Sequence, residues 1–161
     1  MIGAFVIFGD VELTIACAKE LLKRAPEFDY MVAPEAKAIP LVHEMARQLG
    51  RNDYFLVRKA PKLYMDGVFE TEVKSITTEA VQKLYMDGAD AKKLKGKRVL
   101  ILDDVISTGE SLRAVEELVN KAGGHVVGRM AILAEGAAAD RDDIIFLEKL
   151  PVFDPEGNPV D

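Results

Sequence analysis

Short apolar runs alternate along the chain with stretches whose apolar residues recur every three or four positions. The first pattern is typical of β-strands and the second of amphipathic helices. We expect strands at 5–8, 30–33, 54–57 and 99–102, then one that takes in 126–127 and 130–133, and a last one at 144–147. The run 99–102 has no polar position, which indicates a strand buried on both faces, as in a parallel sheet.

Helices are predicted between these strands. The first follows Asp10, a residue type that caps helix N-termini, and stops before Pro26. The second ends at Gly50 and the third at Gly123 and Gly124. The expected inward faces are Val11, Ile15, Ala18 and Leu22; then Ile39, Val42, Met45, Ala46 and Leu49; then Leu112, Val115, Leu118, Val119 and Ala122. This alternation predicts an α/β fold, with a parallel sheet flanked by helices.

The stretch 63–88 departs from that alternation. It holds two Asp-Gly turn signals, at Asp66 and Asp87, with exposed strand-like residues between them. We therefore expect a β-rich arm that projects from the sheet over approximately 63–88. The hexapeptide Lys-Leu-Tyr-Met-Asp-Gly occurs at 62–67 and again at 83–88. We attribute the repeat to chance, or to two similar strand ends with similar turns.

Length and composition narrow the functional classes. A chain of 161 residues suits a single domain, 1–161. The lone Cys17 cannot form an internal disulfide, so we expect a reducing, cytoplasmic compartment. The first eight residues lack a basic segment and a cleavage-site pattern, so we expect a strand there and no signal peptide. No apolar run approaches a membrane span, and the net charge of −6 disfavours a nucleic-acid partner.

The sequence from Asp103 to Ser111 carries the clearest chemistry. Two carboxylates follow a buried strand, and a loop with hydroxyls and a glycine leads into a helix. In an open α/β sheet such a position binds ligands, and the helix N-terminus favours a phosphate. The carboxylates can accept hydrogen bonds from sugar hydroxyls or help to hold a divalent cation. A ribose 5-phosphate fits this loop; the alternative is an ordinary strand followed by a helix that Ser107 or Thr108 caps.

The segment Leu102-Asp-Asp-Val-Ile-Ser-Thr-Gly-Glu-Ser111 closely resembles the phosphoribosyl-pyrophosphate loop of type I phosphoribosyltransferases, and the similarity extends from about Phe8 to about Phe153. The resemblance implies the fold of that family and a homodimer. It also implies that Asp103 and Asp104 meet the ribose hydroxyls and hold Mg²⁺. The phosphate-binding residues would be Val105, Ile106, Ser107, Thr108, Gly109, Glu110 and Ser111.

Two further segments resemble the pyrophosphate-binding parts of that family. One is 33–38, similar to a loop that often contains a non-proline cis peptide, although the family usually has glycine where Ala38 stands. The other is the basic segment 57–63, which is similar to that of the adenine and xanthine enzymes. The implied pyrophosphate contacts are Glu35, Ala36, Lys37, Arg58, Lys59 and Lys62. Without the resemblance, 34–38 is a strand-to-helix turn and the cations are a solvated face.

The arm resembles the mobile catalytic lid of the family. The segment Val73-Lys74-Ser75-Ile76-Thr77 is similar to the lid of the xanthine enzymes, whereas the adenine enzymes usually carry a glutamate near Thr77. The resemblance assigns catalytic roles to Lys59, Lys74 and Asp104. A plain surface hairpin is the alternative.

The identity of the base follows from what Ser107 is not. Enzymes for hypoxanthine and guanine usually have an aspartate at this place, and the adenine and xanthine enzymes a small residue. Ile106 would face the base, and Phe153 would stack on it; for Phe153 the alternative is simple packing. The resemblance thus predicts transfer of 5-phosphoribosyl to a purine in nucleotide salvage, with release of pyrophosphate and adenine slightly ahead of xanthine. The alternative function is a non-catalytic sensor that binds phosphoribosyl pyrophosphate.

Overall fold

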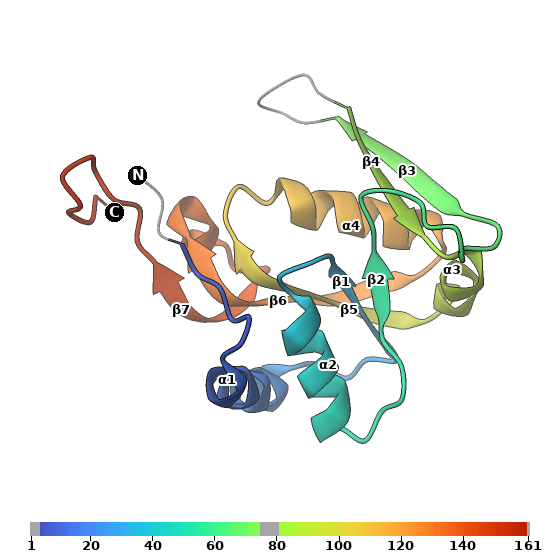
Figure 1. Ribbon diagram of the computed structural model, residues 1–161, viewed down its shortest axis with the longest axis horizontal. Helices are drawn as coiled ribbons and strands as arrows, with labels where there is room; N and C mark the ends of the chain where they lie inside the picture. Colours follow the sequence, from blue (N-terminus) through green and yellow to red (C-terminus); the bar gives the residue numbers. More distant parts are fainter. Residues whose placement is uncertain (1–3, 75–80, 161) are drawn as a thin grey trace.

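A five-stranded parallel sheet forms the centre of the protein. The computed structural model describes residues 4–74 and 81–160. The strands are β1 (Tyr30–Pro34), β2 (Phe55–Val57), β5 (Arg98–Ile106), β6 (His125–Glu135) and β7 (Ile145–Leu150). They lie in the order β2-β1-β5-β6-β7, and every neighbouring pair is parallel (Figure 1). The predicted α/β class is confirmed.

Helices cover both faces of this sheet. The helices α1 (Val11–Arg24) and α2 (Ile39–Gln48) pack on one face, and α4 (Glu110–Lys121) packs on the other (Figure 1). The short helix α3 (Gly88–Leu94) precedes β5, and the 3₁₀ helix η1 (Gly136–Asp140) joins β6 to β7. In the described part of the chain, no helix has the length and apolar composition to cross a bilayer.

The run Val99–Leu102 of β5 separates two hydrophobic cores. Val99 and Ile101 belong to the core under α4, whereas Leu100 and Leu102 belong to the core under α1 and α2. Because successive strand residues point to opposite faces, one uninterrupted apolar run can fill both layers. The prediction that this strand is buried on both faces is confirmed.

The start of the chain differs from the sequence prediction. Asp10 caps α1 as expected, because its side chain accepts a hydrogen bond from the backbone N–H of Leu13 at 3.0 Å. The inward face of α1 is different, however: Val11 and Ile15 are exposed, and the buried residues are Thr14, Cys17, Ala18 and Leu21. The expected strand at 5–8 is also wrong, since this segment pairs with no strand and contributes Ile7 to the core as an irregular segment.

The helix α3 is an element that the sequence analysis did not predict. Asp87, expected only as part of a turn, caps this helix by accepting a hydrogen bond from Ala89 N–H at 3.0 Å. Leu94 of α3 is fully buried, although it stands among the lysines of a charged stretch. Charge density along the chain therefore concealed a short amphipathic helix.

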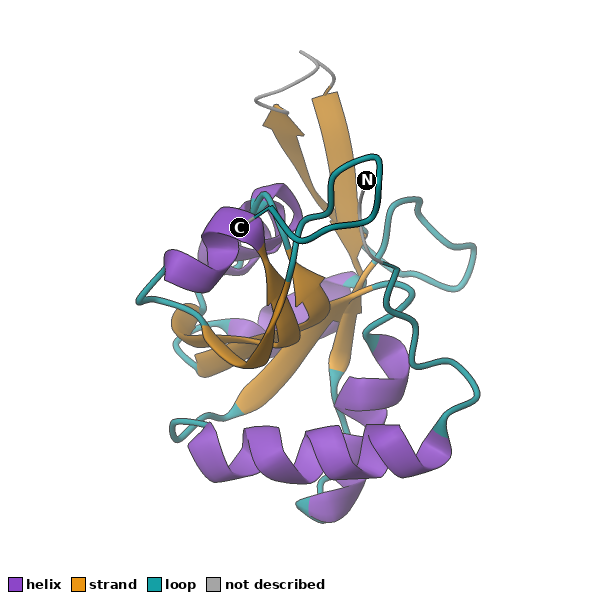
Figure 2. Ribbon diagram, turned by 90° about the vertical axis from the view of Figure 1, so that its left-hand side faces the viewer, coloured by secondary structure: helices purple, strands orange, loops and turns teal. Residues whose placement is uncertain are grey.

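The predicted arm is a two-stranded antiparallel hairpin of β3 (Phe69–Lys74) and β4 (Val81–Met86), which extends away from the sheet (Figures 1 and 2). Ser75, Ile76 and Thr77, which carry the resemblance to the xanthine lid, lie outside the described residues. The arm joins the main sheet through Arg58 and Tyr85, whose backbones exchange two hydrogen bonds of 2.8 Å.

The two copies of the hexapeptide meet at the base of this arm. Only the copy at 83–88 contains a strand, so the interpretation as two similar strand ends is wrong. The N–H of Gly88 donates to the carbonyl of Asp66 at 3.2 Å, and a Cβ at Gly88 would lie 2.1 Å from the carbonyl oxygen of Gly67. Position 88 therefore requires glycine.

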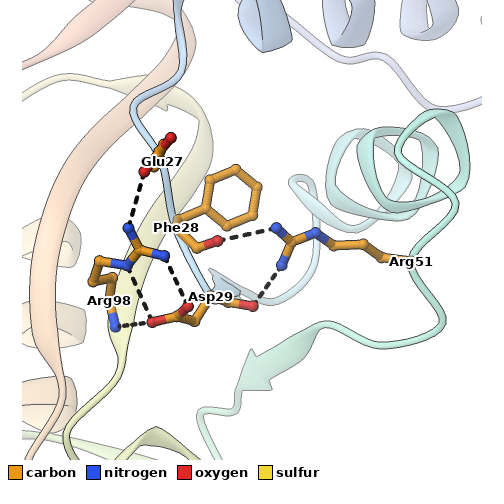
Figure 3. A network of polar contacts seen from close by, with 5 residues as sticks. All are labelled: Glu27, Phe28, Asp29, Arg51 and Arg98. Carbon is orange, nitrogen blue, oxygen red and sulfur yellow. Dashed lines mark hydrogen bonds and ion pairs between the residues drawn. The ribbon is translucent and has the colours of Figure 1, made fainter.

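A polar network fixes the N-terminal end of β5, which begins at Arg98 (Figure 3). Arg98 pairs with both Asp29 and Glu27, and its backbone N–H also donates to Asp29 at 2.7 Å. The hydrogen bonds from Arg98 lower the pKa of Asp29 to about 2. Arg51 donates to the carbonyls of Phe28 and Asp29, which ties the start of β2 to the start of β1.

We expect Leu100→Ala to lower the free energy of unfolding by about 2–5 kcal/mol, because it leaves a cavity in a fully buried layer. Leu63→Ala is the matched control, since the Leu63 side chain is exposed. Urea unfolding followed by circular dichroism measures both variants. Equal losses in the two would contradict the burial of β5 on its α1 and α2 face.

Candidate functional site

The sequence-predicted site segments meet at the carboxyl edge of the sheet. The segment 35–37 follows β1, Arg58 and Lys59 follow β2, and the loop 107–109 follows β5. The carboxyl ends of parallel strands share one edge, and this is where open α/β sheets bind ligands. The fold therefore brings together residues that are up to 76 positions apart in the sequence, from Glu35 to Ser111.

A cavity of about 480 Å³ lies at this edge. Eight of the sequence-predicted site residues line it: Glu35, Ala36, Lys37, Lys59, Asp103, Asp104, Val105 and Ser111. A smaller hollow of about 100 Å³ adjoins it and is lined by Ile106, Ser107, Thr108 and Gly109. Asp103, Val105 and Ser111 border both, so the two hollows adjoin.

The aspartate pair lies inside β5 and does not follow its end. The strand continues to Ile106, and Asp104 is buried, with 6% of its surface exposed. Both residues nevertheless line the cavity, so Asp104 faces the expected ligand site although little of its surface is exposed. The backbone N–H of Asp104 donates to the Asp103 carboxylate at 2.8 Å.

The electrostatics of Asp103 follow from this position. Burial raises the pKa of Asp103 to about 8, and the side chain of Asp104 acts in the same direction through a hydrogen bond and its charge. The backbone N–H of Asp104 and the positive charge of Lys37 act in the opposite direction. A cation or a set of hydroxyl donors placed between the carboxyls would favour the ionised form of Asp103.

The carboxylates at this site suit a cation that takes most of its ligands from the substrate and from water. The part of the chain that the structure describes holds no group of three or more His, Cys, Asp or Glu side chains suited to a metal ion. Mg²⁺ keeps several waters and is usually held by one or two carboxylates together with substrate phosphates. Asp103 and Asp104 supply those two carboxylates at the cavity wall.

The smaller hollow has the features of a phosphate site. Its loop leads into the N-terminus of α4, where free backbone N–H groups and the helix dipole favour an anion. Gly109 is the N-cap and has a φ of +82°, a left-handed conformation that suits glycine. Ser107, Thr108 and Ser111 are exposed and add hydroxyl donors around the hollow.

The loop after β1 forms another part of the cavity wall. The peptide bond between Glu35 and Ala36 is cis, as in the pyrophosphate loop that this segment resembles, although Ala38 stands in place of glycine. The backbone N–H of Lys59 donates to Glu35 at 2.9 Å, and Arg58 pairs with Glu35 at 2.8 Å. These two donors hold the pKa of Glu35 below its ordinary value. Arg58 also donates to the hydroxyl of Tyr64 at 2.8 Å.

Several predicted residues stand apart from the cavity wall. Ile106 is buried in the core under α4 and borders only the smaller hollow. Lys62 is exposed in the segment that leads to the arm, and Lys74 belongs to β3. Phe153 is half-buried in the segment after β7, where it forms a bridge with Pro159. Glu110 begins α4 beside the loop.

The structure adds residues that sequence reasoning missed. Phe8 and Leu84 line the cavity, the first from the irregular N-terminal segment and the second from β4. Glu135, at the end of β6, accepts a hydrogen bond from the Ser107 hydroxyl at 2.8 Å. The available sequence signal for Glu135 was a carboxylate directly after an apolar run.

Comparisons with known proteins agree with this geometry. A family model described as the phosphoribosyl transferase domain matches residues 13–155. The adenine phosphoribosyltransferase of Thermotoga petrophila is 40% identical over 109 residues, which cover 68% of this chain and 60% of that protein. The enzyme of the same name from Bifidobacterium longum is 35% identical over 119 residues, which cover 73% of this chain and 58% of that protein. The chain therefore spans about three fifths of the length of these curated relatives.

Solved structures show the same architecture. The adenine phosphoribosyltransferase of Thermoanaerobacter pseudethanolicus superposes with a TM-score of 0.73 at 27% identity, over 89% of this chain and 84% of that one. The enzyme of the same name from Rhodothermus marinus has a TM-score of 0.69 at 25% identity, over 87% of this chain and 79% of that one. The predicted sheet and its flanking helices are thus those of a known fold.

The pKa of Asp103 predicts how stability depends on pH. Because Asp103 releases its proton near pH 3.8 when unfolded and near pH 8 when folded, the free energy of unfolding of the metal-free protein should fall as pH rises between these values. Asp103→Asn should flatten this dependence, and the exposed Asp142→Asn should not. Urea unfolding in a chelator at pH 5 and pH 8 measures the three proteins. If the free energy of unfolding of Asp103→Asn depends on pH as steeply as that of the parent protein, the raised pKa of Asp103 is not the cause.

Proposed function

The chain belongs to the phosphoribosyl transferase domain family, and on this premise we propose that it is a purine phosphoribosyltransferase of nucleotide salvage. It transfers the 5-phosphoribosyl group from phosphoribosyl pyrophosphate to a ring nitrogen of a purine and releases pyrophosphate. One observation carries the proposal: the aspartate pair, the loop 35–37 and Lys59 surround one cavity that adjoins the phosphate hollow.

Each part of the site has a place in this reaction. The loop 105–111 holds the 5-phosphate, and Asp103 and Asp104 accept hydrogen bonds from the two ribose hydroxyls. Lys37, Arg58, Lys59 and Lys62 stabilise the negative charge that develops on the departing pyrophosphate, together with the backbone of Glu35 and Ala36. Asp103 and Asp104 would hold Mg²⁺, which would supply further positive charge to offset that of the pyrophosphate.

The donors that contact Glu35 in this structure could contact pyrophosphate in its place. Arg58 and the N–H of Lys59 are both committed to the Glu35 carboxylate, and both side chains of the ion pair are largely buried. An incoming pyrophosphate offers the same donors a more highly charged acceptor. This makes Arg58 a pyrophosphate contact. We assign the catalytic roles to Lys59, to Lys74 on the arm and to Asp104.

Adenine is the base that we favour slightly over xanthine. Relatives with the name adenine phosphoribosyltransferase support adenine. Ser107 supports it too, because a serine cannot give a base with a 6-oxo group the general acid–base help that a carboxylate would give. Ile106, Phe153 and the cavity-lining Phe8 supply the apolar surfaces for the ring.

The surroundings of the reaction complete the proposal. Residues 1–161 act as one domain, with the arm over approximately 63–88 as a lid that excludes water from the cationic sugar. The buried, unpaired Cys17 supports a reducing, cytoplasmic environment, which fractionation of the native cells would test by locating the protein there. The partners are phosphoribosyl pyrophosphate and a purine base, with no nucleic acid or membrane.

We expect the purified protein to release pyrophosphate when phosphoribosyl pyrophosphate, Mg²⁺ and adenine are supplied. The value of kcat/KM should be highest for adenine, then xanthine, and lower for hypoxanthine, guanine, orotate and uracil. A preference for hypoxanthine or guanine would refute the argument from Ser107. Binding of phosphoribosyl pyrophosphate without turnover of any base would establish the non-catalytic sensor instead.

The same assay has a sharp negative control. The double variant Asp103→Asn, Asp104→Asn should abolish Mg²⁺-dependent binding of phosphoribosyl pyrophosphate in calorimetric titration, because neutral amides replace the charged acceptors. The single variant Asp142→Asn is the matched control at an exposed carboxylate. If the double variant still unfolds cooperatively on heating and binds phosphoribosyl pyrophosphate as tightly as the parent protein, the site assignment is wrong.

The homodimer is supported by an apolar surface beside the site. Val11 and Ile15 of α1 are exposed, and with Ile39 and Pro40 of α2 they line a hollow of about 360 Å³. Sedimentation equilibrium should give twice the mass of one chain, and Val11→Lys with Ile15→Lys should shift it to that of one chain. Leu63→Lys, at an exposed residue before the arm, should leave the dimer intact. A monomeric parent protein would reject this part of the proposal.

A further inference from the structure

Arg141 reaches the phosphate loop from a different part of the chain. It lies between η1 and β7, 32 positions after Gly109. Its Nη1 atom is so close to the loop that a Cβ placed on Gly109 would be 2.7 Å from it. The backbone N–H of Arg141 donates to the carbonyl of Ala138 at 3.2 Å, which fixes the residue at the end of η1.

The guanidinium of Arg141 is held in a defined orientation. Its Nε and Nη2 atoms donate to the two carboxylate oxygens of Asp143, at 2.8 and 2.7 Å. This bidentate pairing fixes the plane of the guanidinium and leaves Nη1 at Gly109. The two side chains are 36% and 42% exposed, so their ion pair alone contributes little to stability. The arrangement is therefore better explained by what Nη1 does at the loop.

The loop has a charge deficit that Arg141 offsets. The sequence 99–112 contains no Lys or Arg, and it contributes the carboxylates of Asp103, Asp104 and Glu110. Glu135 adds another carboxylate through its contact with Ser107. A phosphate monoester carries nearly two negative charges, whereas a helix N-terminus supplies only about half a positive charge. Arg141 lies against the wall of this hollow at Gly109, where it adds positive charge.

We propose that Arg141 is a positioning residue for the 5-phosphate of the ligand. It supplies positive charge behind the loop 107–109 and supports the left-handed turn at Gly109, while Asp143 orients it. This inference rests on the proposed function, because it concerns how the same site holds a phosphorylated ribose. The glycine at 109 has a second reason here, since any side chain would displace the guanidinium.

The test compares two ligands that use different parts of the site. Adenosine 5′-monophosphate needs the phosphate loop, and inorganic pyrophosphate needs the loop 35–37 with Arg58 and Lys59. In calorimetric titration, Arg141→Gln should weaken binding of the nucleotide roughly tenfold or more, as expected for losing one charged contact, and leave pyrophosphate affinity within about twofold. The loss should shrink at high salt, which screens the charge.

Two further variants separate charge from structure. Arg141→Lys keeps the charge and should recover most of the nucleotide affinity. Arg47→Gln is the matched control, because Arg47 forms a similar surface pair with Glu44 away from the site. Unchanged nucleotide affinity in Arg141→Gln, or equal losses of nucleotide affinity in the Gln and Lys variants, would overturn the inference. A parallel loss of pyrophosphate affinity would also overturn it, since that indicates general damage to the fold.

The failure of this inference differs from a failure of the proposed function. If the parent protein binds neither adenosine 5′-monophosphate nor pyrophosphate, the proposed function fails. If the parent binds both and Arg141→Gln binds both equally well, the function stands and the role of Arg141 is rejected.

Discussion

The burial of β5 on both faces is the constraint on which the rest of the structure depends. Four consecutive apolar residues fill two cores, so the strand cannot shift by one position without exchanging the contents of both layers. The next two residues of the same strand are Asp103 and Asp104, and they are carried to the edge in a fixed position. At the other end, Arg98 is anchored to Asp29 and Glu27. The carboxylates are therefore placed by hydrophobic packing, which also accounts for the raised pKa of Asp103.

The charges of the site come from several strand ends and are arranged in pairs. Glu35 engages Arg58, Glu135 engages Ser107, and Asp143 engages Arg141. Each pair gives a polar side chain a fixed orientation before any ligand is present, which reduces the cost of ordering the site on binding. The result is a cavity with carboxylates on β5 and cations on the loops after β1 and β2.

The sequence predicted those features whose signals are local. Alternating periodicity identified the parallel sheet, the run 99–102 identified its central strand, and 103–111 identified residues that line the two adjoining hollows. The errors arose where several apolar residues competed for one core. Val6 and Val11 are as apolar as core residues but lie on the surface, and Leu94 is buried within a charged stretch. Arg141 and Gly109 come from different elements and lie close together only in the folded chain. The residues around each of them in the sequence give no sign of the other.

The backbone bridge between Arg58 and Tyr85 has a consequence for how such arms can differ in length. Leu84 lines the cavity wall, and its neighbours Lys83 and Tyr85 point to the other side of β4 because side chains alternate along a strand. Inserting or deleting one residue between Tyr85 and Gly88 would shift the register of β4 by one position. Lys83 or Tyr85 would then take the place of Leu84 in the cavity wall. Insertions or deletions between β3 and β4 leave the bridge, and therefore the wall, in register. Natural variation in arm length should accordingly concentrate between the two strands, whereas the five-residue frame 84–88 should keep its length.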